Sequence, residues 1–154
     1  MTLNLPEYNV NVRRSNESKL QIFDCLRAKF VSLTPEEWVR QHFVNYLINF
    51  KGYPISRMAN EVGLNQNGLC RRCDTVVYDS AAYPLMIVEY KAPTIAVSPK
   101  VFDQIVRYNM VMRVPWLAVS NGMRHYCCRV DFDSATYRFV KEIPEYPRLD
   151  CRES

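Results

Sequence analysis

Asp74, Glu89 and Lys91 have the types and spacing of a hydrolytic site at the end of a β-sheet. Residues 85–88 form an apolar run between two prolines, which predicts a buried strand. Because side chains alternate along a strand, Glu89 and Lys91 should project from one face at its carboxyl end. Asp74 falls near the predicted start of a neighbouring strand, 75–78. Two carboxylates and an ammonium are costly to bury unless they serve a purpose, such as holding a hard cation for phosphodiester hydrolysis.

The donor types point to Mg²⁺, with Mn²⁺ as a possible substitute. Mg²⁺ prefers oxygen ligands and usually takes one or two carboxylates while keeping several waters. Asp74 and Glu89 could supply those carboxylates, and the Tyr90 carbonyl could add a backbone ligand. The ion would lower the pKa of a bound water and stabilise charge on the phosphate. Lys91 would orient the attacking water or stabilise the developing negative charge.

A helix is predicted to begin at Thr34, a suitable N-cap, with Pro35 at the first helical position and Glu37 completing a capping box. Apolar residues then recur at helical spacing, and Gly52 with Pro54 ends the element. Glu36 shares the stripe of the apolar residues Val39 and Phe43. This pattern predicts that Glu36 points inward as an added metal-site carboxylate, while Glu37 serves the cap.

Several other side chains are candidate nucleic-acid ligands. Arg40, one turn beyond Glu36, is a candidate for binding a phosphate. Gln104 and Tyr108 share a face of a second predicted helix that opens at Ser98-Pro99, so both could reach a phosphate or Lys91. Arg72 could bind backbone phosphate. The alternative for each is a solvated charge, an ion pair or a half-exposed helix face.

The remaining elements complete a single predicted α/β domain over residues 1–154. Residues 19–33 are ambiguous between strand and short helix. We expect a short helical piece at 55–61 and a Gly/Asn-rich turn at 63–68. A third buried strand is expected at 116–119, and an antiparallel pair of strands at 125–131 and 136–140. The predicted fold is a central mixed sheet flanked by helices. Its core spans about 30–143, with peripheral arms at 1–19 and 144–154.

Composition sets wider limits. An apolar content of 48% indicates an ordered protein, and a net charge of +4 permits a polyanionic partner without requiring one. The amino terminus lacks a secretory signal and no apolar run approaches the roughly 20 residues of a membrane span, so a cytoplasmic location is expected. Cys70 and Cys73 with the contiguous Cys127 and Cys128 match a zinc site poorly, which favours reduced thiols.

Five segments in this order and spacing resemble the PD-(D/E)XK nuclease superfamily, and more narrowly the amino-terminal nuclease domain of the type I restriction enzyme R subunit. They are TPEEWVRQ at 34–41, RRCD at 71–74, IVEYKAP at 87–93, QIVRYN at 104–109 and SNG at 120–122. The resemblance implies a restriction-endonuclease-like core. It also implies Mg²⁺-dependent DNA cleavage by Asp74, Glu89 and Lys91, helped by Gln104 and Tyr108.

Two departures accompany the resemblance. Cys73 stands where the superfamily pattern has its first proline, and the helicase-like motor that follows the nuclease in the R subunit is not among these 154 residues. Expected partners are DNA, motor or specificity subunits, and a second copy of the chain, since cutting two strands favours pairing. The alternative function is a catalytically idle nucleic-acid-binding or adaptor module with the same fold. A nuclease acting on RNA or in repair would share the site.

Overall fold

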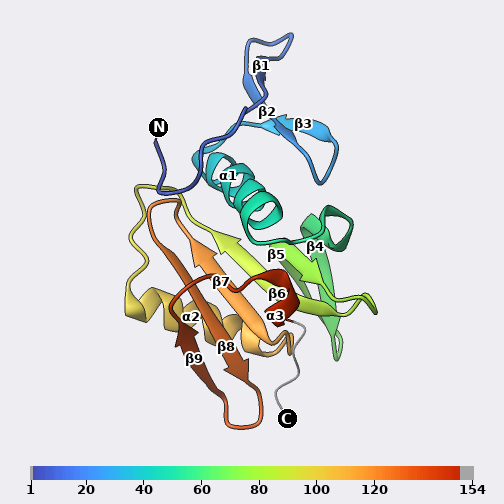
Figure 1. Cartoon of the computed structure of the whole chain (residues 1–154), viewed down its shortest axis with the longest axis vertical. Helices are drawn as coiled ribbons and strands as arrows, with labels where there is room; N and C mark the ends of the chain where they lie inside the picture. Colours follow the sequence, from blue (N-terminus) through green and yellow to red (C-terminus); the bar gives the residue numbers. More distant parts are fainter. Residues whose placement is uncertain (1, 150–154) are drawn as a thin grey trace.

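A mixed six-stranded sheet, in the order β4-β5-β6-β7-β8-β9, forms the centre of the molecule (Figure 1). The computed structural model describes residues 2–149. The strands are Met58–Gln66, Leu69–Tyr78, Pro84–Tyr90, Trp116–Ser120, His125–Asp131 and Thr136–Val140. Only β6 and β7 run parallel within this sheet, because α2 (Pro99–Met110) crosses between them. The predicted α/β fold with a central mixed sheet, consistent with a restriction-endonuclease-like core, is confirmed.

Both long helices begin where the sequence predicts. The hydroxyl of Thr34 accepts a hydrogen bond from the Glu37 amide at 3.0 Å, and Pro35 opens α1 (Pro35–Phe50). The hydroxyl of Ser98 accepts from the amide of Val101 at 3.2 Å at the start of α2. Each cap satisfies an amide that would otherwise lack an intrahelical partner.

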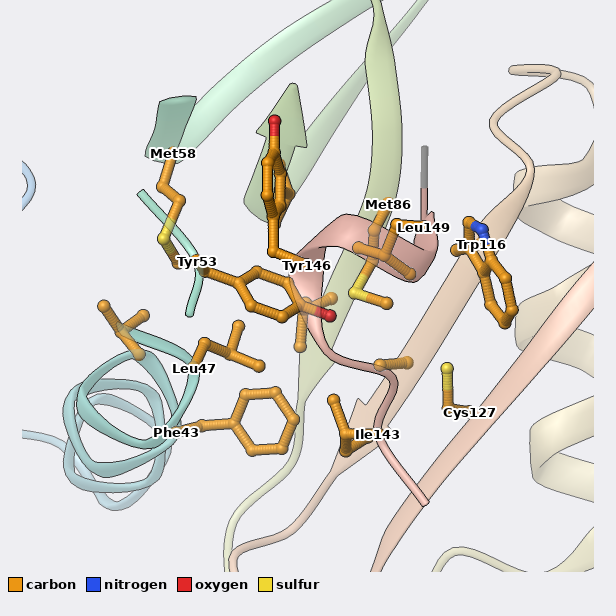
Figure 2. Close-up of a cluster of buried hydrophobic side chains, with 14 of the residues drawn as sticks. Phe43, Leu47, Tyr53, Met58, Met86, Trp116, Cys127, Ile143, Tyr146 and Leu149 are labelled. Carbon is orange, nitrogen blue, oxygen red and sulfur yellow. The ribbon is translucent and has the colours of Figure 1, made fainter. Parts of the chain in front are cut away.

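The two faces of the central sheet bury separate apolar cores. Figure 2 shows the first, in which Phe43 and Leu47 of α1 face Met86 and Cys127 of the sheet. Part of the segment predicted as an arm closes this core, because α3 (Tyr146–Leu149) packs into it. Side chains of α2 pack on the other face of the sheet, where Cys128 of β8 is buried. The sheet is therefore covered on both sides, which accounts for the fully apolar run before Glu89.

A small antiparallel sheet lies beyond the first turns of α1, away from the central sheet (Figure 1). Its strands are β1 (Val12–Arg14), β2 (Leu20–Asp24) and β3 (Lys29–Ser32). The segment 19–33, which the sequence left open between strand and helix, is thus β-structure. Side chains of this sheet reach the central sheet, since the amide of Asn60 in β4 donates to buried Asp24 at 2.9 Å.

Three sequence predictions around β4 and β5 are wrong. The helical piece is limited to a short 3₁₀ turn at Ile55–Arg57, and β4 begins at the next residue. Most of the predicted turn at 63–68 is strand, because cross-strand pairing with β5 outweighs its Gly/Asn composition. Asp74 lies inside β5 rather than near its start.

Two further expectations concern the carboxyl-terminal arm and the lack of a membrane-spanning segment. Residues 150–154 of the predicted arm lie outside the described residues. No described helix combines the length and apolar character needed to cross a bilayer.

Candidate active site

A hollow of about 600 Å³ lies at the carboxyl end of β6, bordered by the first turn of α1 and by β5. Asp74, Glu89 and Lys91 all line it, so the fold brings the three predicted catalytic residues together. The other predicted residues on its wall are Tyr90, Glu36 and Arg40. The lining is completed by Arg27, Val31, Ser32, Thr34, Glu37 and Glu61.

The regular pairing of β5 with β6 ends at the edge of this hollow. Regular pairing of β5 with β6 reaches Thr75 opposite Val88. Beyond that pair, the Asp74 carboxylate accepts a hydrogen bond from the Tyr90 amide at 2.9 Å. On the other edge of β6, the Lys91 amide donates to the Ser120 carbonyl. Because the N–H and C=O of one strand residue point to the same edge, the Tyr90 carbonyl is directed toward the Asp74 side.

Asp74, Glu89 and Lys91 form no ion pair within 4 Å among the side chains that the structure describes, those of residues 2–147 and 149. Burial raises the pKa of Asp74, and the Tyr90 amide and the positive charge of Arg40 offset this only in part. Burial likewise raises the pKa of Glu89, against the hydrogen bond from Asn109, and the negative charge of Asp74 adds to the increase. The site therefore holds two carboxylates whose charged forms are poorly stabilised by the protein alone.

The surrounding charges, in contrast, form a chain of ion pairs. It runs through Asp24, Arg27, Glu37, Arg40, Glu61 and Arg72, with contacts of 3.1 Å or less. Burial raises the pKa of Asp24 and of Glu61, but their hydrogen bonds and the positive charges of their arginine partners outweigh it, so both pKa values are lowered. Two kinds of carboxylate thus lie close together. Asp24, Glu37 and Glu61 are paired with arginines, whereas Asp74 and Glu89 are not.

Arg40 occupies the centre of this chain rather than standing free for a phosphate. Its side chain is buried and donates to Glu37, to Glu61 and to the backbone carbonyl of Asp74 at 2.7 Å. Glu61 lies between the cross-strand pairs Asn60–Thr75 and Val62–Cys73 and has a left-handed backbone, φ +57°, which is costly for a non-glycine residue. Arg40 therefore holds the backbone of Asp74 in place, and its role as a phosphate ligand stays a prediction.

The predicted inward orientation of Glu36 is wrong. Its side chain is exposed, whereas Glu37 is buried and accepts hydrogen bonds from Arg27, Arg40 and Gln41. Val39, one turn further along the same stripe, is buried in the core, whereas Glu36 at the first turn of α1 lies at the wall of the hollow. Glu36 still lines the hollow, and its role as a metal ligand stays a prediction.

Gln104 and Tyr108 lie on the exposed face of α2 and are not among the residues that line the hollow. Arg71 packs on the Tyr108 ring and donates to the Tyr108 carbonyl. Arg72 is exposed and its Nε lies 3.1 Å from Glu61. The predicted contacts of Gln104, Tyr108 and Arg72 with phosphate are therefore untested.

Asn109, which sequence reasoning missed, contacts the site directly. Its side-chain amide donates to Glu89 at 2.9 Å and to the Ile105 carbonyl at 2.9 Å. Its buried Oδ1 has no hydrogen-bond partner among the described residues. One signal was available, because Asn109 continues the apolar stripe of Phe102, Ile105 and Val106, where a polar residue requires a reason.

A buried polar chain beneath the site was also missed. The Tyr90 hydroxyl lies 2.9 Å from the Thr75 hydroxyl, which donates to Asn60 at 2.6 Å. Asn60 in turn donates to Asp24 of the small sheet. These bonds link the strands that carry Asp74 and Glu89, and such satisfied networks restrict a buried region to one arrangement.

The family model for the type I restriction enzyme R protein N terminus matches residues 35–144, from the start of α1 to beyond β9. The chain belongs to this family. The predicted resemblance to the R subunit is confirmed at this level and gives the chain a restriction-enzyme-related role. No curated protein matches the sequence.

The residues of this family member at the hollow suit a hard cation. Asp74, Glu89 and the Tyr90 carbonyl provide oxygen donors, the chemistry that Mg²⁺ prefers. Within the described part of the chain, no group of three or more His, Cys, Asp or Glu residues is placed to hold a metal ion. Burial raises the pKa of both carboxylates, so a nearby cation would stabilise their charged forms. Away from the hollow, the side chains of the contiguous Cys127 and Cys128 point into opposite cores, as the alternation of side chains along a strand predicts.

Proposed function

We propose that this chain is a Mg²⁺-dependent nuclease domain of the PD-(D/E)XK type that hydrolyses DNA phosphodiester bonds. The observation that carries the proposal is the contrast in pairing at the hollow. Asp74, Glu89 and Lys91 have no ion-pair partner among the side chains that the structure describes, while Arg27, Glu37, Arg40 and Glu61 around them are paired. A structural cluster would be expected to neutralise itself, whereas a site for a cation and a phosphate keeps its charges available.

Asp74, Glu89 and the Tyr90 carbonyl would hold Mg²⁺ or Mn²⁺, with Glu36 as a further carboxylate at the rim. The bound ion supplies a water of lowered pKa and positive charge beside the phosphate. Asn109 keeps one Glu89 oxygen in place through its hydrogen bond, and Arg40 anchors the Asp74 backbone. Both are positioning residues in this proposal.

Lys91 acts on the reacting groups. Its ammonium would orient the attacking water or offset the negative charge that grows on the phosphate. The water oxygen bonds to phosphorus while the bond to the leaving oxygen breaks, and a proton passes to that oxygen. Gln104, Tyr108 and Arg72 would contact neighbouring phosphates. Partner motor or specificity subunits, and a second copy for the opposite strand, would complete a double-strand cut.

Metal binding separates this nuclease from an idle adaptor with the same fold. Calorimetric titration of the full chain with Mn²⁺ should show a saturable site that Glu89→Gln weakens at least tenfold. Gln keeps the acceptor for Asn109, so the loss would reflect charge rather than fold. Glu142→Gln, an exposed acid at the other end of the sheet, is the matched control. Absence of Mn²⁺ binding by the folded protein would favour the adaptor.

A further inference from the structure

A second hollow, of about 570 Å³, lies at the end of the central sheet opposite the candidate active site. Trp116, the first residue of β7, lines it, whereas Glu89 lies at the other end of the parallel neighbour β6. Lys51, at the carboxyl end of α1, also lines it. The 16 residues of α1 span about 24 Å, so the two hollows are well separated.

Two arginines stand side by side on the wall of this hollow. Trp116 pairs with Arg129 across β7 and β8, and Arg129 pairs with Arg138 across β8 and β9. Directly opposed residues share a face, so the two guanidinium groups extend over the same surface. The Arg129 guanidinium lies 5.2 Å from the centroid of the Trp116 ring. Like charges placed opposite each other destabilise a sheet unless a counter-charge lies between them.

Neither arginine forms an ion pair with a carboxylate among the side chains that the structure describes. Lys51 and Lys141 bring the cations on the wall to four, against the two carboxylates of Glu142 and Glu145. None of these six side chains forms an ion pair within 4 Å with another side chain that the structure describes, in residues 2–147 and 149. At the first hollow, in contrast, arginines 27, 40 and 72 are paired with carboxylates.

We propose that this basic hollow, defined by Lys51, Arg129, Arg138 and Lys141, binds phosphate groups. Guanidinium groups present planar pairs of N–H donors that match phosphate oxygens, and a bound anion would relieve the repulsion between the two arginines. The volume lies in the range of small-ligand sites. The phosphate belongs either to a nucleic-acid backbone or to a free phosphorylated ligand. The site is independent of the proposed nuclease function.

The test is equilibrium binding of two probes, pyrophosphate and a short DNA duplex, both in EDTA so that no cleavage occurs. Arg138 is exposed, so Arg138→Gln should fold normally. We expect this variant to bind a probe at least tenfold more weakly than the wild type. Arg129→Gln/Arg138→Gln should lose that binding. Lys100→Gln removes one exposed charge from α2, on the opposite face of the sheet, and should change affinity less than twofold.

The pattern of loss identifies the source of the phosphate. Weaker binding of the duplex, with or without weaker binding of pyrophosphate, assigns the hollow to a nucleic-acid backbone. Weaker binding of pyrophosphate alone assigns it to a free ligand. If both probes bind to the folded arginine variants as they bind to the wild type, the proposal is overturned.

Discussion

At the scale of single residues, what distinguishes a candidate catalytic carboxylate here is the partner it lacks. Asp24 is fully buried and Asp74 is partly buried, and burial raises the pKa of each. Asp24 accepts hydrogen bonds from Arg27 and Asn60, which lower its pKa below the ordinary value. Asp74 accepts a hydrogen bond from the backbone amide of Tyr90, which does not outweigh the effect of burial, so its pKa stays raised. The unbalanced charge is what a cation would stabilise.

Replacing Glu89 with Gln should therefore raise the melting temperature of the metal-free protein at neutral pH. A raised pKa means that Glu89 ionises less readily in the folded than in the unfolded chain. Its contribution to the free energy of unfolding then falls as the pH rises from its ordinary pKa through the raised one. Melting curves in EDTA should show the gain of Glu89→Gln at about pH 7.5 and a smaller gain at about pH 4. A lower melting temperature than the wild type at neutral pH would contradict this.

At the scale of elements, local signals in the sequence predict helix starts better than they predict which side chains turn inward. The caps at Thr34 and Ser98 are local chemistry and could be foreseen. The burial of Glu37 depends on Arg27, which reaches it from the loop between β2 and β3. Strand β4 was missed for the same reason, because its partner β5 stabilises it against its own composition.

The adjacent glutamates of α1 give a matched pair of variants. Glu37→Ala removes the buried carboxylate that Arg27 and Arg40 share, leaving their charges uncompensated. We expect the free energy of unfolding to fall by about 3 kcal/mol or more. Glu36→Ala removes an exposed acid from the same turn and should cost less than about 0.5 kcal/mol. Urea denaturation of both variants tests this, and equal losses would show that Glu37 does not organise the site.

The role of α2 can be tested at Asn109. Truncation to Ala leaves Glu89 without its side-chain hydrogen bond. Because partners of ligating carboxylates tune the ligand, Mn²⁺ affinity should fall roughly 10- to 100-fold. Asn49→Ala, an exposed asparagine on α1, serves as the control and should bind Mn²⁺ like the wild type. Unchanged affinity in folded Asn109→Ala would remove Asn109 from the positioning role.

At the scale of the whole molecule, the fold joins segments that are distant in sequence into one site. The segments carrying Asp74, Glu89 and Lys91 were recognisable from the sequence because chemistry and strand pattern coincide there. The linkage of the small sheet to the site through Asp24 and Asn60 was not, since it needs contacts between residues 36 positions apart. Part of this linkage also lies outside the matched family segment, which begins at residue 35.

DNA cleavage with a Lys91→Met variant tests the central claim most directly. Supercoiled plasmid and single-stranded DNA are incubated with the purified chain in Mg²⁺, Mn²⁺ or EDTA, beside Lys91→Met and the exposed control Lys100→Met. The wild type and the control should cleave with metal and not in EDTA. Lys91→Met should lose about 10²–10³-fold in rate while still binding Mn²⁺ and DNA. Full cleavage by Lys91→Met, or none by folded wild type in either metal, would contradict the account.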